Sequence, residues 1–329
     1  MAPIRRSWTT RACRLVPKAM VVCFIIVFPS VTPITFAASP PVTALSFTSD
    51  SNNIVSGSQA GLTIESLDGR VTKKRITSLE NIHAISISPN RNMFLVAGGA
   101  PAQLGSIELL TWRESKPHAV YELHEDLIYA ASWRPDGKRF VTAGGDSVCH
   151  VVDVATGKIT ASFKGHSRRV LAVVFLADGK TIVSAGIDET LRVWRAADGS
   201  EIRTRHNHTA AVNALALKPV KQNNDRSVLP VIASASADRT VRFWQPTIGR
   251  MMRFARLPSE PLAVAWLPDG TKLLASCKDG GVYQIDPNTV KTKLVKKVKG
   301  WATSLVVSND GKFAAVGTDR VAVISLDAR

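Results

Sequence analysis

The chain has 329 residues, of which 45% are apolar and 21% charged, and its formal net charge is +16. This composition excludes a disordered protein and provides enough apolar surface for one large domain or two ordinary ones. The basic surplus makes an anionic partner or surface one class of ligand to consider.

The first 37 residues differ in composition from the rest of the chain. They carry five basic residues, namely Arg5, Arg6, Arg11, Arg14 and Lys18. The apolar run "AMVVCFIIVF" (19–28) comes next, followed by the small-residue stretch "PSVTPITFAAS". This order predicts a signal peptide over residues 1–37 with cleavage after Ala37, because signal peptidase prefers small residues such as Thr35 and Ala37. The protein is therefore expected to be secreted or periplasmic.

An uncleaved N-terminal membrane anchor is the alternative, because no charged residue occurs between Lys18 and Asp50. Pro29 and Pro33 interrupt the helix that an anchor needs, which favours cleavage. Both interpretations place the rest of the chain outside the cytoplasm, and membrane contact is expected only for the uncleaved form.

Cleavage after Ala37 lowers the net charge to +11, because the segment carries five basic residues and no acidic one. It leaves Cys149 and Cys277, which are too few for a disulfide framework. We expect them to be two separate thiols.

A repeat fills the remainder of the chain. Seven segments each begin with a small residue, continue as a short apolar strand and run into a turn. They begin at Ala44, Ala84, Ala130, Ala172, Ala214, Ala263 and Ser304. Intervals of 40 to 49 residues with several short strands predict a propeller, because one four-stranded blade cannot bury its own faces. The two longer intervals are explained by insertions at loop positions. The stretch 98–106 lengthens the hairpin between the second and third strands of the second unit, and 220–230 lengthens the first hairpin of the fifth unit.

We place the blade starts near residues 42, 82, 128, 170, 212, 261 and 302, after a short linker over 38–41. The repeat resembles the WD-repeat β-propeller family, in its secreted bacterial type, over residues 42–329. The resemblance rests on His before the first strand, Ser or Thr in the second strand, Asp in the next turn and Trp in the third strand. It implies an all-β, seven-bladed propeller.

Two units carry this complete tetrad of residue types. They are the fourth, with His166, Ser184, Asp188 and Trp194, and the fifth, with His208, Ser234, Asp238 and Trp244. The third unit has His124, Thr142 and Asp146, but Val152 stands where tryptophan belongs.

In this family the tetrad forms a hydrogen-bonded chain from the indole through the hydroxyl and the imidazole to the carboxylate. Ser, His and Asp are also the residues of a hydrolase triad, which is the alternative interpretation. A nucleophilic serine must face a substrate and an oxyanion hole, whereas a serine capped by tryptophan behind a loop cannot. We therefore expect structural tetrads and no catalytic residues.

No motif in the chain indicates a cofactor. A Walker loop and a Cys-x-x-Cys-His haem attachment site are both absent from the sequence. The stretch "DVATGKITA" (153–161) resembles the docking motif of quinoprotein dehydrogenase propellers, but Ala161 stands where that motif has tryptophan. His206 and His208 could share a metal ion, but His208 already belongs to a tetrad, so we expect no metal site.

In this family the loops before the first strands and the turns between the second and third strands share one face, the upper face. Its charged candidates for binding are Glu125, Asp126, Arg168, Arg169, Arg239, Lys278 and Arg320. A second basic feature, "KTKLVKKVK" (291–299), falls on the outer strand of the sixth unit. These lysines either discourage edge-to-edge aggregation or attract an anionic envelope polymer. No aromatic residues alternate with them, so nucleic acid is not expected.

The predicted function is a non-catalytic scaffold that binds a protein partner in the cell envelope or outside the cell. A polyanion- or polysaccharide-binding module is the alternative. A propeller enzyme with a site in the central channel is less favoured, because the inner first strands are almost wholly apolar or small.

We also expect the seventh blade to have three strands. In this family the outer strand of the last blade usually comes from the N-terminus. Here the upstream candidate "VTPITF" (31–36) would be removed by cleavage, and "ASPP" (38–41) is too short and too rich in proline to pair.

Overall fold

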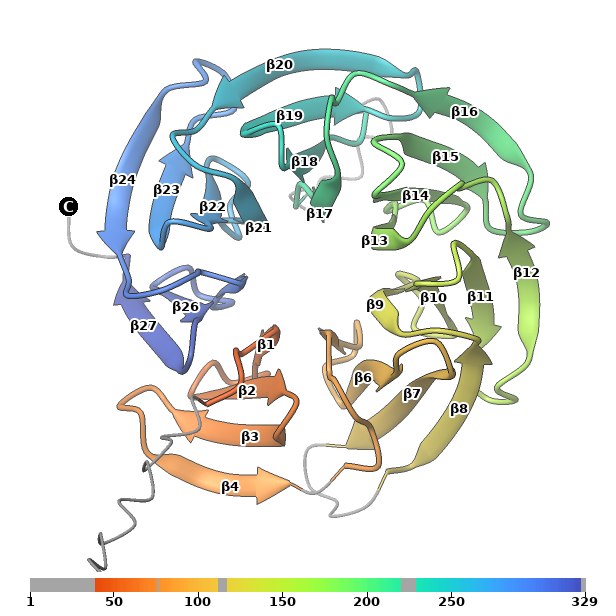
Figure 1. Cartoon of the computed structure of the whole chain (residues 1–329), viewed down its shortest axis with the longest axis horizontal. Coiled ribbons are helices and arrows are strands. Elements are labelled where there is room, and N and C mark those ends of the chain that lie inside the picture. The colour runs from red at the N-terminus through yellow and green to blue at the C-terminus, as the bar shows by residue number, and fades with distance from the viewer. Residues whose placement is uncertain (1–38, 76, 112–116, 220–228, 327–329) are drawn as a thin grey trace, which may run out of the picture. The chain divides into compact units, whose positions relative to one another are not determined.

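The computed structural model describes residues 39–75, 77–111, 117–219 and 229–326, all within the unit Ala38–Arg329. It confirms the prediction of an all-β, seven-bladed propeller (Figure 1). In this part of the chain every regular element is a strand, and no helix is long and apolar enough to cross a membrane. The predicted signal peptide over residues 1–37 lies outside the described residues.

Each blade is an antiparallel sheet whose strands follow the chain from the centre of the ring outwards (Figure 1). Blade 1 contains β1 (Ala44–Phe47), β2 (Asn53–Ser58), β3 (Gly61–Ser66) and β4 (Val71–Arg75). Blade 2 contains β5 (Ala84–Ile87), β6 (Met93–Ala100), β7 (Leu104–Thr111) and β8 (Ala119–His124). Blade 3 contains β9 (Ile128–Trp133), β10 (Arg139–Gly144), β11 (Cys149–Asp153) and β12 (Ile159–Phe163).

The other half of the ring repeats this plan. Blade 4 contains β13 (Val170–Phe175), β14 (Thr181–Gly186), β15 (Leu191–Arg195) and β16 (Glu201–Arg205). Blade 5 contains β17 (Val212–Leu217), β18 (Ile232–Ser236), β19 (Thr240–Gln245) and β20 (Arg250–Arg256). Blade 6 contains β21 (Pro261–Trp266), β22 (Leu273–Cys277), β23 (Gly281–Ile285) and β24 (Thr292–Lys297). Blade 7 contains β25 (Ser304–Val307), β26 (Phe313–Gly317) and β27 (Val321–Ser325), three strands within the described residues.

The apolar core lies between neighbouring blades rather than inside any one of them. Second strands such as β14 and β18 are buried along nearly their whole length, because both of their faces pack against other blades. In one such layer the rings of Phe163 from blade 3 and Trp194 from blade 4 stack with centroids 5.2 Å apart. A blade is therefore stable only within the ring.

The insertion at 98–106 lengthens the hairpin between the second and third strands of blade 2, as expected, but most of its residues are paired strand residues and not a loop. Strands β6 and β7 are eight residues each and continue their pairing through Gly98 with Ser106, Gly99 with Gly105 and Ala100 with Leu104. The extra residues extend the hairpin itself because small side chains let the two backbones remain paired. Most of the second insertion, at 220–230, lies outside the described residues.

Residue Val42 joins the two ends of the ring. Its N–H donates to the carbonyl of Thr318 at 2.8 Å, and its carbonyl accepts from the hydroxyls of Thr303 at 2.7 Å and Ser304 at 2.8 Å. Blade 7 is thus fastened to blade 1 through the inner part of the ring. Cys149 and Cys277 are separate buried thiols in blades 3 and 6, and burial raises the pKa of both.

Candidate functional site on the upper face

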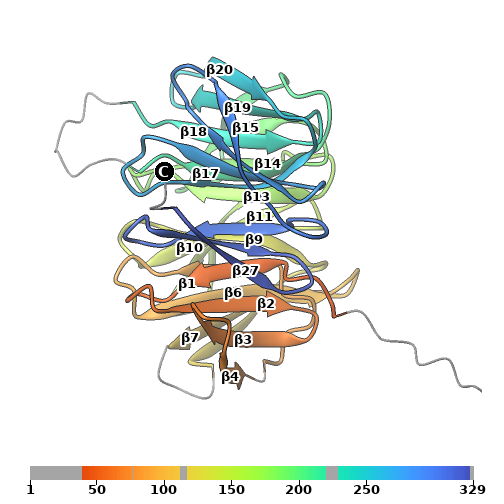
Figure 2. The same cartoon turned by 90° about the vertical axis from the view of Figure 1, so that its left-hand side faces the viewer.

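The loops before the first strands and the turns between the second and third strands bond directly to one another. Gly145 N donates to Leu127 O at 2.8 Å, Ile187 N to Arg169 O at 3.0 Å, and Lys278 N to Glu260 O at 2.8 Å. Both sets of segments therefore lie on one face of the ring, which we call the upper face. The side view shows the loops gathered along the two edges of the blades (Figure 2).

Blade 4 contains a complete hydrogen-bonded tetrad. The Trp194 indole N–H donates to the Ser184 hydroxyl at 3.1 Å, which lies 2.8 Å from Nε2 of His166. Nδ1 of the same imidazole lies 2.8 Å from the Asp188 carboxylate. Ser184 and Trp194 are fully buried, so the serine cannot reach a substrate, and the chain fastens the loop before blade 4 to the blade itself.

Blade 5 repeats this geometry closely. The distances are 2.8 Å from Trp244 to Ser234, 2.8 Å from Ser234 to His208 and 2.7 Å from His208 to Asp238. His208 uses both ring nitrogens within this tetrad, and His206 is exposed.

The carboxylates of these tetrads are held ionised. Burial alone would raise the pKa of Asp188, but hydrogen bonds from His166 and Thr190 outweigh burial and lower that pKa to about 2. In the same way, bonds from Thr240 and His208 overcome burial and bring the pKa of Asp238 to about 2. Burial also lowers the pKa of His208, so its imidazole is neutral at neutral pH.

Blade 3 brings together the three residues of the incomplete tetrad. His124 Nε2 lies 2.7 Å from the Thr142 hydroxyl, and its Nδ1 lies 2.9 Å from Asp146. With Val152 in place of tryptophan, no indole reaches Thr142. The structure adds His150, whose ring centroid lies 4.5 Å from that of His124, and burial lowers the pKa of His150 to about 4.

In blade 2 a buried glutamate fastens the loop before β5, and the sequence did not predict this contact. Glu108 on β7 is fully buried, and its carboxylate accepts bonds from Thr77 Oγ1 at 2.7 Å, Ser78 N at 2.8 Å and Ser78 Oγ at 2.5 Å. One carboxylate thus replaces the His–Asp pair of the other blades. A buried Glu among apolar strand residues was the only signal that could have indicated this role.

The charged candidates do not form one cluster, since they lie on the loops of five different blades. Six of them are exposed, namely Glu125, Arg168, Arg169, Arg239, Lys278 and Arg320. Asp126 is partly buried and accepts backbone bonds from Ala102 and Leu127, both at 2.8 Å. Both bonds go to Oδ1, which therefore connects the loops of blades 2 and 3, while Oδ2 lies 4.0 Å from Arg169 Nε.

Trp301, which the sequence analysis missed, is the most exposed large apolar side chain of the described residues, at 60%. It lies in the loop before β25, and Lys278 Nζ lies 4.9 Å from the centre of its ring. Trp301 also lines a pocket of about 320 Å³ together with Pro41, Lys299 and Asp319. An exposed indole beside cationic groups is a typical anchor for a protein partner.

Polar residues near the start of the inner strands contact the neighbouring blades. The Thr43 hydroxyl donates to the carbonyl of Ile82 in the next blade, and Asn213 donates to Glu260 at 3.1 Å. The rings of His83 and Tyr129 pack with centroids 5.0 Å apart.

Comparison with known proteins identifies the repeat. The model of the family "WD domain, G-beta repeat" matches residues 115–153, 157–195 and 199–245. These three segments match WD40 repeats, and together they make up less than half of the chain. The matched segments include the tetrads of blades 4 and 5 and the incomplete tetrad of blade 3.

Eukaryotic WD-repeat proteins are among the proteins to which the chain is similar. One is WD repeat-containing protein AAC3 of Dictyostelium discoideum, 30% identical over 28% of this chain and 18% of the relative. Another is the guanine nucleotide-binding protein subunit beta of Lymnaea stagnalis, 34% identical over 38% of this chain and 37% of the relative. A third is nuclear distribution protein PAC1 of Arthroderma benhamiae, 26% identical over 56% and 41%. The chain thus spans less than half of each of these relatives, and the secreted bacterial type stays a prediction.

Proposed function

We propose that this WD40-repeat propeller is a non-catalytic scaffold that binds a protein partner on its upper face around Trp301. WD-repeat propellers generally act as protein-interaction scaffolds, and one relative is by name a subunit of a guanine nucleotide-binding protein. The observation that carries the proposal is the 60% exposure of Trp301 next to the pocket that it lines. Burying an indole of this size on binding would release a large apolar area from water.

We also propose that the scaffold binds its partner outside the cytoplasm. The basic, apolar and small-residue order of residues 1–37 supports export, so the partner belongs to the cell envelope or the extracellular space. The lysines Lys278 and Lys299 beside Trp301 favour a partner segment that carries acidic residues around an apolar anchor.

The experiment is affinity isolation of the tagged chain from the envelope fraction of its own cells, with three versions compared. Trp301→Ala should reduce recovery of the partner at least about tenfold, as loss of a tryptophan hot spot does. Phe254→Ala is the matched control, because Phe254 on β20 is a 45% exposed aromatic ring with the Arg242 guanidinium 5.4 Å from its centre. Unchanged recovery with Trp301→Ala, or equal loss with both variants, would contradict the upper-face site.

A polyanion-binding module is the second candidate, favoured by the exposed lysines Lys293 and Lys296 on β24. Retention on an anionic matrix that falls steeply with salt, and falls further in Lys293→Glu/Lys296→Glu, would support it. The protein-scaffold proposal instead expects partner recovery to survive that double change.

A further inference from the structure

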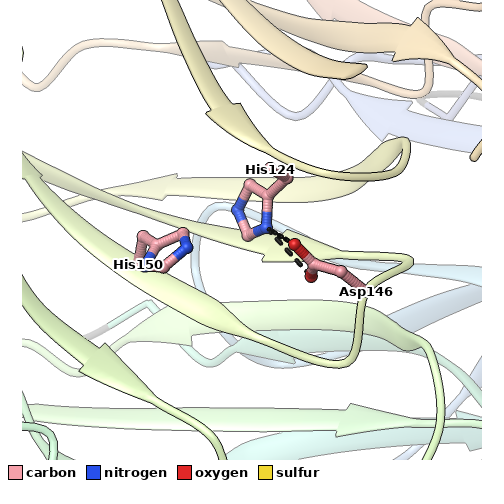
Figure 3. A group of neighbouring side chains, drawn as sticks. All are labelled: His124, Asp146 and His150. Atoms are coloured by element: carbon pink, nitrogen blue, oxygen red, sulfur yellow. Dashed lines mark hydrogen bonds and ion pairs between the residues drawn. The ribbon is translucent and has the colours of Figure 1, made fainter. Parts of the chain in front are cut away.

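Three metal-ligating side chains lie together at the junction of blades 2 and 3. His124 ends β8, Asp146 lies in the turn between β10 and β11, and His150 lies on β11 (Figure 3). Each offers one ligand atom, and these atoms all lie within 4.8 Å of one another. The His124 side chain is fully buried and that of Asp146 is 14% exposed, so the group is enclosed but within reach of solvent.

Blade 3 differs from blades 4 and 5 in the residue that pairs with the tetrad hydroxyl residue across the sheet. His150 pairs across the sheet with Thr142, as Arg192 pairs with Ser184 and Arg242 with Ser234. Both arginines bring a guanidinium nitrogen near the tetrad carboxylate, 3.8 Å from Asp188 and 3.5 Å from Asp238. In blade 3 that place is taken by an imidazole, which carries no fixed positive charge.

The hydrogen bonds around the two imidazoles are compatible with metal ligation. His150 Nδ1 lies 2.8 Å from the Ser162 hydroxyl, so its proton can be held on that side while Nε2 keeps a lone pair. The Thr142 hydroxyl can accept from His124 Nε2–H and donate to the carbonyl of His150, 3.4 Å away. In this tautomer His124 Nδ1 presents a lone pair toward Asp146, so both groups can bind one cation, whereas in the other tautomer Nδ1–H donates to the carboxylate.

We propose that His124, Asp146 and His150 form a binding site for a divalent transition-metal ion such as Zn²⁺. Two imidazoles and one carboxylate are a common donor set for this class of metal, and a water molecule or a partner's side chain can supply a fourth ligand. Metal–ligand distances of about 2.0–2.2 Å require small rotations of the three side chains. Ligation through His124 Nδ1 requires the neutral imidazole to carry its proton on Nε2, where the Thr142 hydroxyl accepts it, so no net proton is released. The metal's charge takes the place of the guanidinium in blades 4 and 5.

The test uses Zn²⁺ and Co²⁺ with the purified chain and measures binding by calorimetry, by the visible absorption of bound Co²⁺ and by the thermal unfolding midpoint. The wild type should bind one ion and unfold at a higher temperature when Zn²⁺ is present, since a ligand that binds only the folded state stabilises it. His150→Arg copies the arrangement of blades 4 and 5, so it should fold without metal yet bind Zn²⁺ at least about 100-fold more weakly. Ser162→Ala should weaken binding about tenfold, because the imidazole loses its orienting partner.

His206→Ala is the control, because His206 is exposed and lies on another blade, and it should leave all three readings unchanged. The proposal is overturned if the wild type shows no response to Zn²⁺ up to about millimolar concentration. It is also overturned if His150→Arg responds as the wild type does. Neither result depends on whether Trp301 binds a protein.

Discussion

Asp188 does more than complete a tetrad. Its carboxylate accepts bonds from His166 Nδ1 at 2.8 Å, Thr190 Oγ1 at 2.9 Å, Thr190 N at 3.2 Å and Ser167 N at 3.3 Å. It therefore connects the loop before blade 4 to the turn between β14 and β15. Asp238 has the same role in blade 5, with His208, Thr240 and the Thr209 N–H as its donors.

Asp188→Ala should lower the free energy of unfolding by roughly 1–3 kcal/mol, because it leaves several donors without their partner at a largely buried site. Thr142→Val should cost less, because the Thr142 hydroxyl contacts only His124 and, at 3.4 Å, the carbonyl of His150, and no indole depends on it. Urea midpoints measure both, and Asp198→Ala, in an exposed turn, is the control and should change stability by less than about 0.5 kcal/mol. Equal midpoints for Asp188→Ala and Thr142→Val would refute this account.

The same carboxylates predict how stability depends on pH. Asp188 and Asp238 have pKa values of about 2 in the folded chain, against an ordinary value of 3.8. Their contribution is complete above pH 3.8 and is lost as pH falls through 2, because the unfolded chain takes up protons first. Asp188→Asn should therefore show a shallower fall of the urea midpoint between pH 4 and 2 than the wild type. Parallel profiles would show that Asp188 is not the group responsible.

For single residues, the sequence predicted the tetrads, but it did not predict the exposure of Trp301 or the position of His150 beside His124. The tetrads were predictable because four residue types recur at matching places in two units. Trp301 stands just before an apolar strand, where sequence alone suggests burial, and its exposure depends on how the loop before β25 meets the ring. His150 looks like a lone histidine on a strand, and only the docking of blade 2 against blade 3 places it beside His124.

At the scale of secondary structure, strands were predictable where an apolar run lies between two turn sequences. Each second strand is an apolar run between two turns, so its position follows from the sequence. The sequence predicted a longer hairpin between β6 and β7, but not that Gly98 and Gly99 continue the strand pairing, because these glycines resemble loop residues. Whether a small-residue stretch pairs depends on a partner strand at the right distance, which composition does not report.

The N-terminal segment is the element whose fate matters most for function. We predict processing between Ala37 and Ala38, because Thr35 and Ala37 occupy the two positions that signal peptidase inspects. Fractionation followed by N-terminal sequencing of the exported form should give Ala38 as the first residue, in a form outside the cytoplasm. Recovery of the intact chain in membranes alone would instead favour the uncleaved anchor, and Ala37→Arg, which blocks the recognition position, should reproduce that outcome.

At the scale of the whole molecule, the described residues close the ring by contacts near its centre and place no strand beyond β27 at its rim. Val42 joins blades 7 and 1 through Thr318, Thr303 and Ser304. Farther out, β27 pairs with β26 on one side and with no other strand of the described residues. A pocket of about 350 Å³ lies beside β27, lined by Val323 and Leu326 from this side and by Lys293 and Val295 from β24 of blade 6.

The difference between the bonded inner part of the ring and the outer edge of β27, which is unpaired in the described part of the chain, predicts that the ring opens first at β27. β15 lies between β14 and β16, so its amides are protected from both sides, whereas β27 lacks a neighbour on its outer edge within the described residues. Native-state hydrogen exchange should therefore be at least about tenfold faster, averaged over Val321–Leu326, than over Leu191–Trp194. Amides of β26, which has strands on both sides, provide the comparison within the same blade and should exchange more slowly than those of β27. Equal protection of β27 and β15 would mean that a further strand covers this edge in solution, supplied from outside the described residues or by another chain, and the three-stranded blade would then be wrong.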